Sequence, residues 1–169
     1  LLYNLVRLTR PEIAVEIGTA KGNSAIAIAQ ALEDNKKGKL YTIDPVEQEL
    51  VKIAIRKSRL SHRINYIIDY STKVISKLDF KKIDFAFIDG WHDYDSVWDD
   101  FNLVKNLIPR GGIIAFHDTI LFEGAKRVIE QIKLLDQYEI ITLPTLSGGK
   151  INDLNKSDKN FIPDGVLIG

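Results

Sequence analysis

The sequence predicts an α/β fold, a doubly wound Rossmann-like sandwich in which helices cover both faces of a mostly parallel sheet. Short apolar runs typical of buried strands alternate with amphipathic helical patterns along most of the chain. Right-handed crossovers between parallel strands then place helices on both faces. Polar residues follow the ends of the apolar runs, where such sheets bind ligands. No helical pattern separates the last two expected strands, which predicts antiparallel neighbours at one edge.

The strands and the first two helices are predicted from apolar runs and their boundaries. A short amphipathic helix covers residues 1–11 and ends at Pro11. The first strand is Ile13–Ile17, and the helix after it is expected to begin with Asn23 or Ser24 as N-cap. The remaining strands are expected, in chain order, over 40–43, 64–68, 83–88, 113–116, 138–143 and 165–169. Residues 146–163 are expected to form a polar loop.

Four further helices are predicted from apolar residues spaced three and four apart. Pro45 suits the first turn of the first of these helices, and Ser71 suits the N-cap of the second. The aromatic residues of the third helix are expected to pack in the core. The four apolar faces comprise Leu50, Ile53, Lys57 and Leu60; Val74, Ile75 and Leu78; Tyr94, Val97, Trp98, Phe101 and Val104; and Ala125, Val128, Ile129, Ile132 and Leu135.

Length and composition predict one globular domain over residues 1–169 with a small partner. The 23 basic and 23 acidic residues cancel, so no charge excess favours nucleic acid or a membrane surface. The absence of cysteine excludes a disulfide framework. No signal peptide is visible, so a cytoplasmic location is expected, although a leader ahead of Leu1 and a homo-oligomer both stay open.

The turn after the first strand has the features of a ligand-binding turn. Gly18 and Gly22 bound it, and a helix begins directly afterwards, so backbone N–H groups can face a ligand. An ordinary tight turn is the alternative. Ala20 and Asn23 occupy the second and third glycine positions of a dinucleotide fingerprint, which disfavours NAD. Because Asn23 follows Gly22 where a P-loop has lysine and then Ser or Thr, a nucleoside without phosphates remains.

Motifs at successive strand ends resemble those of one enzyme family. They are Glu16-x-Gly18-x-x-x-Gly22-x-Ser24, Ile43-Asp44, Asp89-Gly90-x-His92-x-Tyr94, Gly111-Gly112 and Phe116-His117-Asp118. In this order they resemble class I S-adenosylmethionine-dependent methyltransferases, and among these the small-molecule O-methyltransferases, over nearly the whole chain. The resemblance, together with the missing last helix, implies seven strands in the order 3-2-1-4-5-7-6, with the last strand antiparallel.

The resemblance also implies roles for residues at the strand ends. It assigns a cofactor-binding set around the methionine end and the glycine turn, a ribose contact to Asp44, an adenine contact to Ser71, and a place beside the transferred methyl to Asp89. Relatives often have Gly-Asp-Ser where this chain has Asp69-Tyr70-Ser71. The full cofactor-binding set is Glu16, Gly18, Thr19, Gly22, Ser24, Asp44, Ser71 and Asp89.

A hydroxyl acceptor must lose a proton, and two routes are open. His92 can act as a general base, because histidine changes its charge close to neutral pH. Alternatively, Asp89 and Asp118 can hold Mg²⁺, which prefers oxygen ligands. Metal-dependent relatives have acidic residues where this chain has His117-Asp118. All four residues, with Asp89, His92 and His117 as the catalytic set, are expected to converge on one pocket.

Other polar and aromatic residues near these motifs receive structural interpretations. His62 is interpreted as a surface residue, and Trp91 either walls the acceptor site or packs. Asp93, Asp95, Asp99 and Asp100 are expected to be solvated charges near a helix N-terminus.

The predicted function is S-adenosylmethionine-dependent O-methylation of a small hydroxylated acceptor, with His92 as base and divalent-metal assistance. One alternative is a relative that performs other chemistry on the same fold. Another is a catalytically inactive or differently specialised nucleoside-cofactor-binding domain of a larger protein. The sequence does not predict which acceptor is used.

Overall fold

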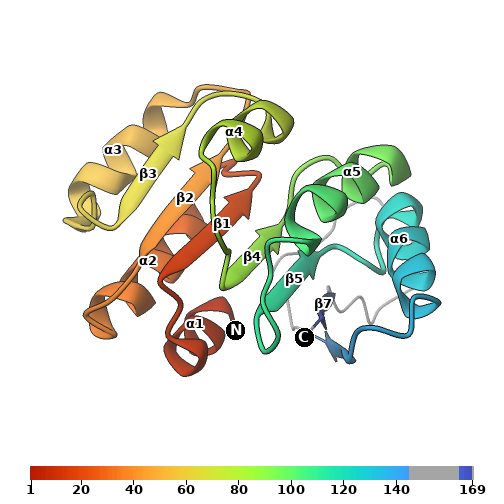
Figure 1. Ribbon diagram of the computed structural model, residues 1–169. Helices are drawn as coiled ribbons and strands as arrows, with labels where there is room; N and C mark the ends of the chain where they lie inside the picture. The colour runs from red at the N-terminus through yellow and green to blue at the C-terminus, as the bar shows by residue number, and fades with distance from the viewer. Residues whose placement is uncertain (145–163, 169) are drawn as a thin grey trace.

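The computed structural model describes residues 1–144 and 164–168, and a seven-stranded sheet runs through them (Figure 1). The strand order is β3-β2-β1-β4-β5-β7-β6, with the first five parallel and β7 antiparallel to both β5 and β6. The predicted order and the antiparallel last strand are confirmed. The loop predicted over 146–163 lies outside the described residues. The strands are β1 (Ile13–Ile17), β2 (Lys39–Ile43), β3 (Ile64–Ile67), β4 (Phe85–Ile88), β5 (Ile113–His117), β6 (Ile140–Pro144) and β7 (Asp164–Ile168).

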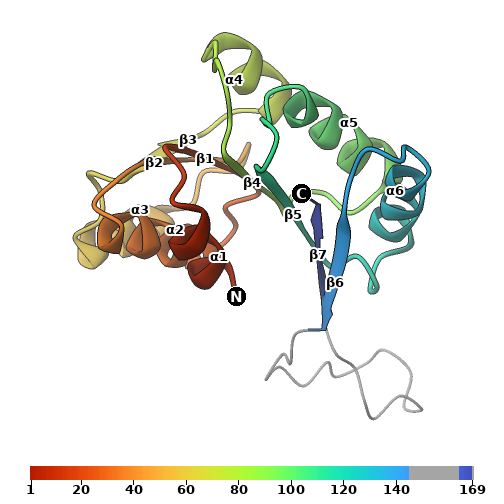
Figure 2. The ribbon, with the colours of Figure 1, turned by 60° about the horizontal axis from the view of Figure 1, so that its bottom comes forward.

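In the described residues, helices cover both faces of the sheet, three on each side (Figure 2). One layer contains α1 (Leu2–Thr9), α2 (Asn23–Asp34) and α3 (Glu49–Ser58). The other contains α4 (Ser71–Lys77), α5 (Tyr94–Lys105) and α6 (Glu123–Lys133). Across the part of the chain that the structure describes, no helix combines the length and the apolar character that a membrane crossing requires.

The sheet separates two cores, because side chains alternate between its faces. On β1, Ala14 packs with Leu32 of α2, whereas Val15 packs on the side of α5 and α6. Phe101 of α5 is fully buried, with its ring centroid 6.2 Å from that of Phe116 on β5. The predicted core role of the aromatic face of α5 is confirmed.

Three predicted helix starts are wrong. The N-cap of α2 is Gly22 with φ 78°, and no side chain caps that end. Pro45 lies in a turn four residues before α3, where the Asp44 side chain accepts a hydrogen bond from the backbone N–H of Val46. Tyr70 is the N-cap of α4, and the Ser71 hydroxyl donates instead to Asp100 of α5.

The predicted apolar face of α3 is also wrong in part. Val51 and Ile55 are the buried residues of this helix, whereas Leu50 is 75% exposed. The α2 N-terminus selects this face, because a Cβ built on Gly22 would lie 3.4 Å from a methyl group of Val51. The contact places α3 beneath the glycine turn.

Candidate active site

The glycine turn is pressed against the end of the neighbouring strand β4. Gly18 has φ 95°, and a Cβ at this position would lie 2.1 Å from the backbone oxygen of Asp89. Backbone hydrogen bonds hold the approach, since Gly18 N donates to Ile43 O at 2.9 Å and Asp89 N donates to Ile17 O at 2.8 Å. Only glycine combines this φ with this contact. The turn therefore joins the carboxyl ends of β1, β2 and β4.

Asp44, at the end of β2, fixes the shape of the turn. Its Oδ2 accepts hydrogen bonds from the backbone N–H groups of Thr19 at 3.0 Å and Ala20 at 2.9 Å, and its Oδ1 accepts from Val46 N at 2.8 Å. Ala20 has φ 41°, a left-handed conformation that these bonds support. A carboxylate offers about four acceptor positions, so Asp44 can accept one more donor.

Glu16 lies beneath the turn, fully buried on β1. The Thr42 hydroxyl donates to Glu16 Oε2, and the Thr19 hydroxyl oxygen lies 2.6 Å from that of Thr42. Burial raises the pKa of Glu16 to about 7, although the hydroxyls of Ser24 and Thr42 act in the opposite direction. Glu16 therefore supports the turn from the face of the sheet that α2 covers.

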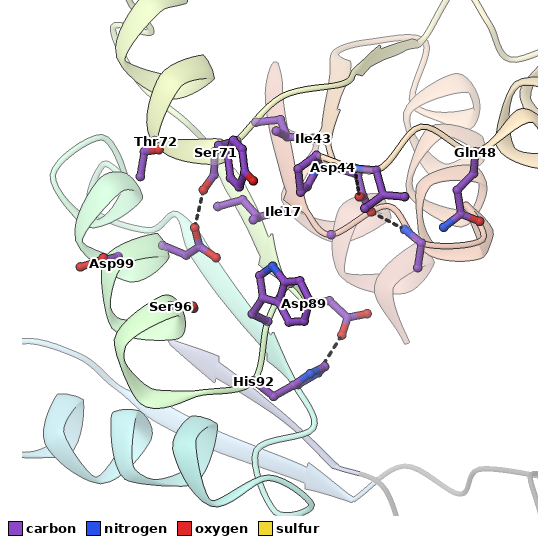
Figure 3. Close-up of a pocket in the computed structure, with 18 residues that line it drawn as sticks. Ile17, Ile43, Asp44, Gln48, Ser71, Thr72, Asp89, His92, Ser96 and Asp99 are labelled. Atoms are coloured by element: carbon purple, nitrogen blue, oxygen red, sulfur yellow. Dashed lines mark hydrogen bonds and ion pairs between the residues drawn. The ribbon is translucent and has the colours of Figure 1, made fainter.

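A pocket of about 580 Å³ opens at the carboxyl ends of the central strands. Asp44 and Gln48 lie on one side, Ser71, Thr72 and Asp99 on the opposite side, and Asp89 and His92 close to each other (Figure 3). Of the predicted site residues, those that line the pocket are Gly18, Asp44, Ser71, Asp89 and His92. The others lie around it, in the turn or on the β5 side: Glu16, Thr19, Gly22, Ser24, His117 and Asp118.

Sequence reasoning missed part of the pocket wall, above all Asp100. Asp100 was expected to be solvated, but it is only 7% exposed and lines the pocket together with Gln48 and Asp99. Burial raises the pKa of Asp100 to about 6, against the hydrogen bond that it accepts from Ser71. A signal was present in the sequence: Asp100 is three residues after Val97 and four before Val104, on the apolar face of α5.

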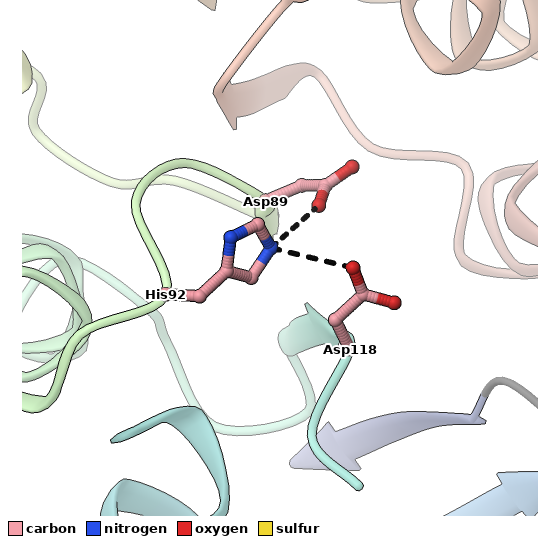
Figure 4. A group of neighbouring side chains, drawn as sticks. All are labelled: Asp89, His92 and Asp118. Atoms are coloured by element: carbon pink, nitrogen blue, oxygen red, sulfur yellow. Dashed lines mark ion pairs between the residues drawn. The ribbon is translucent and has the colours of Figure 1, made fainter. Parts of the chain in front are cut away.

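Asp89, His92 and Asp118 converge beside the pocket, from the ends of β4 and β5 (Figure 4), and His117 joins this cluster. His92 Nε2 lies 3.8 Å from Asp89 Oδ1 and 3.4 Å from Asp118 Oδ2. His117 Nδ1 lies 3.3 Å from Asp89 Oδ1 and 3.0 Å from Asp118 Oδ1. The two aspartates and the two histidines meet at one place, but of these four only Asp89 and His92 line the pocket on which all were expected to converge.

Local geometry orients His92 and Asp118 within this cluster. The His92 ring stacks on Phe122, with centroids 4.2 Å apart and planes 22° apart. A Cβ on Gly124 would lie 2.3 Å from the backbone oxygen of His92, so the start of α6 packs directly on the His92 segment. Asp118 has φ 54°, a left-handed conformation that aspartate tolerates better than most residues.

The electrostatics of the cluster couple the histidines to the carboxylates. Contacts with Asp118 and Asp89 raise the pKa of His117 well above its ordinary value. Burial favours a neutral Asp118, but His117 and His92 outweigh this effect and hold the Asp118 pKa below its usual range. Within the described residues, His92 Nε2 and His117 Nδ1 are both buried and lack a hydrogen-bond partner of suitable geometry.

Three members of the cluster could share a cation. Asp89, His92 and Asp118 each offer one ligand atom, and these atoms lie within 4.8 Å of one another. Divalent ions have ligand distances of roughly 2.0 to 2.6 Å, so one ion fits between such atoms. The donor set is two carboxylates and one imidazole, which combines hard oxygen ligands with a nitrogen ligand.

A doubly wound sheet with a pocket at its switch point defines a class of nucleotide- and nucleoside-binding α/β proteins. Within this class, residues 15–119 match a family described as methyltransferase domain. The chain is 35% identical to a probable caffeoyl-CoA O-methyltransferase 3 of Dictyostelium discoideum, over 97% of the chain and 70% of that protein. It is 30% identical to a flavonoid 3',5'-methyltransferase of Vitis vinifera, over 75% of the chain and 55% of that protein. The chain belongs to the S-adenosylmethionine-dependent methyltransferases of the small-molecule O-methyltransferase type.

Solved structures share the fold at low sequence identity. The O-methyltransferase TomG of Streptomyces achromogenes, in complex with SAM, superposes with a TM-score of 0.77 at 19% identity, over 99% of this chain and 77% of that chain. An O-methyltransferase of Bacillus cereus in complex with SAH also gives a TM-score of 0.77 at 19% identity, over 99% of this chain and 78% of that one. Several curated relatives are matched over only about half of their length.

Proposed function

We propose that this protein transfers a methyl group from S-adenosylmethionine to a hydroxyl group of a small acceptor molecule. The observation that carries the proposal is the position of His92, which lines the pocket and also belongs to the Asp89–Asp118 cluster. A pocket for the methyl donor and a group able to remove a proton are thereby adjacent. Family membership supplies the reaction class.

The residues around the turn fit the methyl donor. Asp44 retains acceptor capacity that suits a ribose hydroxyl, while Gly18 lets the donor approach the backbone between β1 and β4. Glu16, Thr19, Gly22 and Ser24 act by shaping the turn that receives the methionine end of the donor. Asp89 belongs both to the pocket lining and to the cluster, next to the place proposed for the transferred methyl.

The proposed chemistry is an in-line displacement at the methyl carbon. The acceptor hydroxyl gives its proton to His92 Nε2, its oxygen bonds to the methyl carbon, and the carbon–sulfur bond breaks. The sulfur keeps the bonding electrons, so the sulfonium becomes a neutral thioether. Asp89 and Asp118 stabilise the imidazolium that forms, since their oxygens lie 3.8 Å and 3.4 Å from Nε2.

The residues that would hold a divalent ion such as Mg²⁺ are Asp89 and Asp118, with His92 within reach. When bound, such an ion lowers the pKa of a coordinated hydroxyl. His117 keeps the two carboxylates oriented through its contacts at 3.3 Å and 3.0 Å.

Calorimetry and a turnover screen test the proposal. Wild-type protein should bind S-adenosylhomocysteine and should methylate at least one member of a panel of small hydroxylated acceptors. A chelator in the turnover assay separates the two routes of activation, because only metal assistance is lost on chelation. Wild-type protein that binds S-adenosylhomocysteine but methylates no acceptor would favour a non-catalytic cofactor-binding domain, and failure to bind it would contradict the proposal as a whole.

A further inference from the structure

Asp100 is a buried carboxylate in the pocket wall that the methyl-transfer chemistry does not use. It lies in the second turn of α5, and its Oδ1 accepts a hydrogen bond from the Ser71 hydroxyl at 2.6 Å. This bond ties the start of α4 to α5 and fixes the orientation of the carboxylate. Burying a carboxylate costs free energy unless its remaining acceptor positions also receive hydrogen bonds.

The second oxygen of Asp100 points toward the β4 end of the pocket. A Cβ built on Gly90 would lie 3.4 Å from Asp100 Oδ2 and 3.5 Å from a methyl group of Ile17. Gly90 and Asp100 therefore lie next to each other in the pocket lining. Oδ2 is not among the fully buried atoms that lack partners in the described part of the chain, and no hydrogen bond to it is recorded there. It is therefore an acceptor available to a ligand.

The charges of the pocket wall favour a ligand edge that donates hydrogen bonds. The carboxylates that line it are Asp44, Asp89, Asp99 and Asp100, and no lysine or arginine stands beside them in the lining. A ligand group that only accepts hydrogen bonds, such as a ring carbonyl, would be repelled by the negative charge of the Asp100 carboxylate. An amino group would instead donate to Oδ2.

The position of Asp100 identifies which part of the methyl donor it meets. In the proposed function, the ribose lies at Asp44 and the methyl group beside Asp89, so the purine extends toward the opposite side, where Ser71 and Thr72 lie (Figure 3). Adenine presents one exocyclic amino group at the edge farthest from its ribose. Ser71, Thr72 and Asp100 line this side of the pocket together.

We propose that Asp100, oriented by Ser71, is a specificity-determining residue that accepts a hydrogen bond from the 6-amino group of adenine and selects adenosyl cofactors over inosyl analogues. The inference rests on the proposed function. Inosine differs from adenosine at this edge, because a 6-oxo group replaces the 6-amino group and N1 carries a hydrogen. The 6-oxo group would face the carboxylate as acceptor against acceptor.

The first experiment compares two ligands on the wild-type protein by calorimetry at pH 8. S-adenosylhomocysteine should bind about 100-fold more tightly than S-inosylhomocysteine, since a site that hydrogen-bonds an N–H group discriminates strongly against its loss. Equal affinities for the two ligands would overturn the role of Asp100 and leave the proposed function intact. If S-adenosylhomocysteine itself does not bind, the proposed function fails first.

The second experiment changes the carboxylate to its amide. In Asp100→Asn, the side-chain oxygen can still accept from Ser71 while the amide nitrogen donates to a 6-oxo group, so the preference for the adenosyl ligand should fall to less than about fivefold. Asp95→Asn is the matched control, because Asp95 lies exposed on the same helix outside the pocket, and its ligand preference should stay at the wild-type value. An unchanged preference in a folded Asp100→Asn protein, verified by its melting curve, would contradict the proposal. If this variant does not fold, the wild-type comparison decides.

Discussion

The two sides of the pocket differ in what holds their carboxylates, which is backbone N–H groups for Asp44 on the turn side and histidine side chains for Asp118 on the side of β4 and β5. On the turn side, the Asp44 carboxylate accepts three backbone N–H groups and Glu16 Oε2 accepts from Thr42, while Glu16 Oε1 is buried without a hydrogen-bond partner in the described residues. On the side of β4 and β5, the described residues leave the nitrogens His92 Nε2 and His117 Nδ1 buried without a hydrogen-bond partner of suitable geometry.

This difference indicates distinct physical roles. Three backbone hydrogen bonds hold Asp44 and the turn in one geometry without a ligand, which suits recognition of a fixed shape. The cluster retains interactions that a reacting group or a cation can complete, which suits chemistry. Changes to the turn should therefore alter folding and cofactor binding, and changes to the cluster should alter the rate.

The largest expected effect is on the turn, from Gly18→Ala. The added Cβ would lie 2.1 Å from the backbone oxygen of Asp89, so the variant should lose about 4 kcal/mol of unfolding free energy in urea titrations. Gly111→Ala is the matched control, because Gly111 has a similar φ of 85° but no atom within 4 Å of its added Cβ. Gly111→Ala should lose only about 1 kcal/mol, and equal losses in the two variants would show that φ alone determines the effect.

The next effect concerns the cluster. His92→Ala should lower the methyl-transfer rate by about 10² to 10⁴ while the affinity for S-adenosylhomocysteine changes little. Single-turnover kinetics with saturating cofactor measure the rate, and calorimetry measures the affinity. His62→Ala is the control, since His62 forms an exposed ion pair with Glu33, and its rate should match that of the wild type. A His92→Ala rate within about threefold of the wild type would exclude His92 as the base.

Glu16 should make the stability of the protein depend on pH. Its folded-state pKa of about 7 lies above its usual value of 4.5, so the folded state binds a proton that the unfolded state releases. The stability that protonated Glu16 contributes to the folded state is fully present below pH 4.5 and is lost as pH rises through 7. Because Glu16→Gln mimics the protonated form, the wild type should lose up to about 3 kcal/mol relative to this variant between pH 4.5 and pH 8.

Urea unfolding at several pH values tests the Glu16 prediction. The exposed Glu130→Gln variant serves as control and should follow the wild type at every pH. A constant difference between the wild type and Glu16→Gln across the pH range would show that folding does not change the pKa of Glu16.

The smallest effect is expected from Asp44→Ala, which should weaken binding of S-adenosylhomocysteine by about 2 kcal/mol through loss of a charged hydrogen-bond acceptor. Asp44→Asn should weaken it less, because the amide oxygen can still accept from Thr19 and Ala20. Calorimetry of both variants separates the ribose contact from the support of the turn. Wild-type affinity in Asp44→Ala would refute the ribose assignment.

The sequence by itself determined the order of strands and helices and the positions of the polar residues after the strands. The spacing of apolar residues and the positions of glycine and proline determine local backbone structure, so strands, helices and turns can be predicted from the linear sequence. The resemblance to a family extended this pattern to the sheet order and to the meeting of Asp89 with Asp118.

Tertiary structure alone decided the features that depend on contacts between distant residues. The hydroxyl of Ser71 bonds to Asp100, 29 positions away, instead of capping its own helix. Val51 replaces Leu50 as the buried residue of α3 because Gly22 lies above it. Side-chain hydrogen bonds depend on which residues the packing of helices and strands brings together. Asp100 was expected to be solvated, but the packing of α5 places it in the pocket wall.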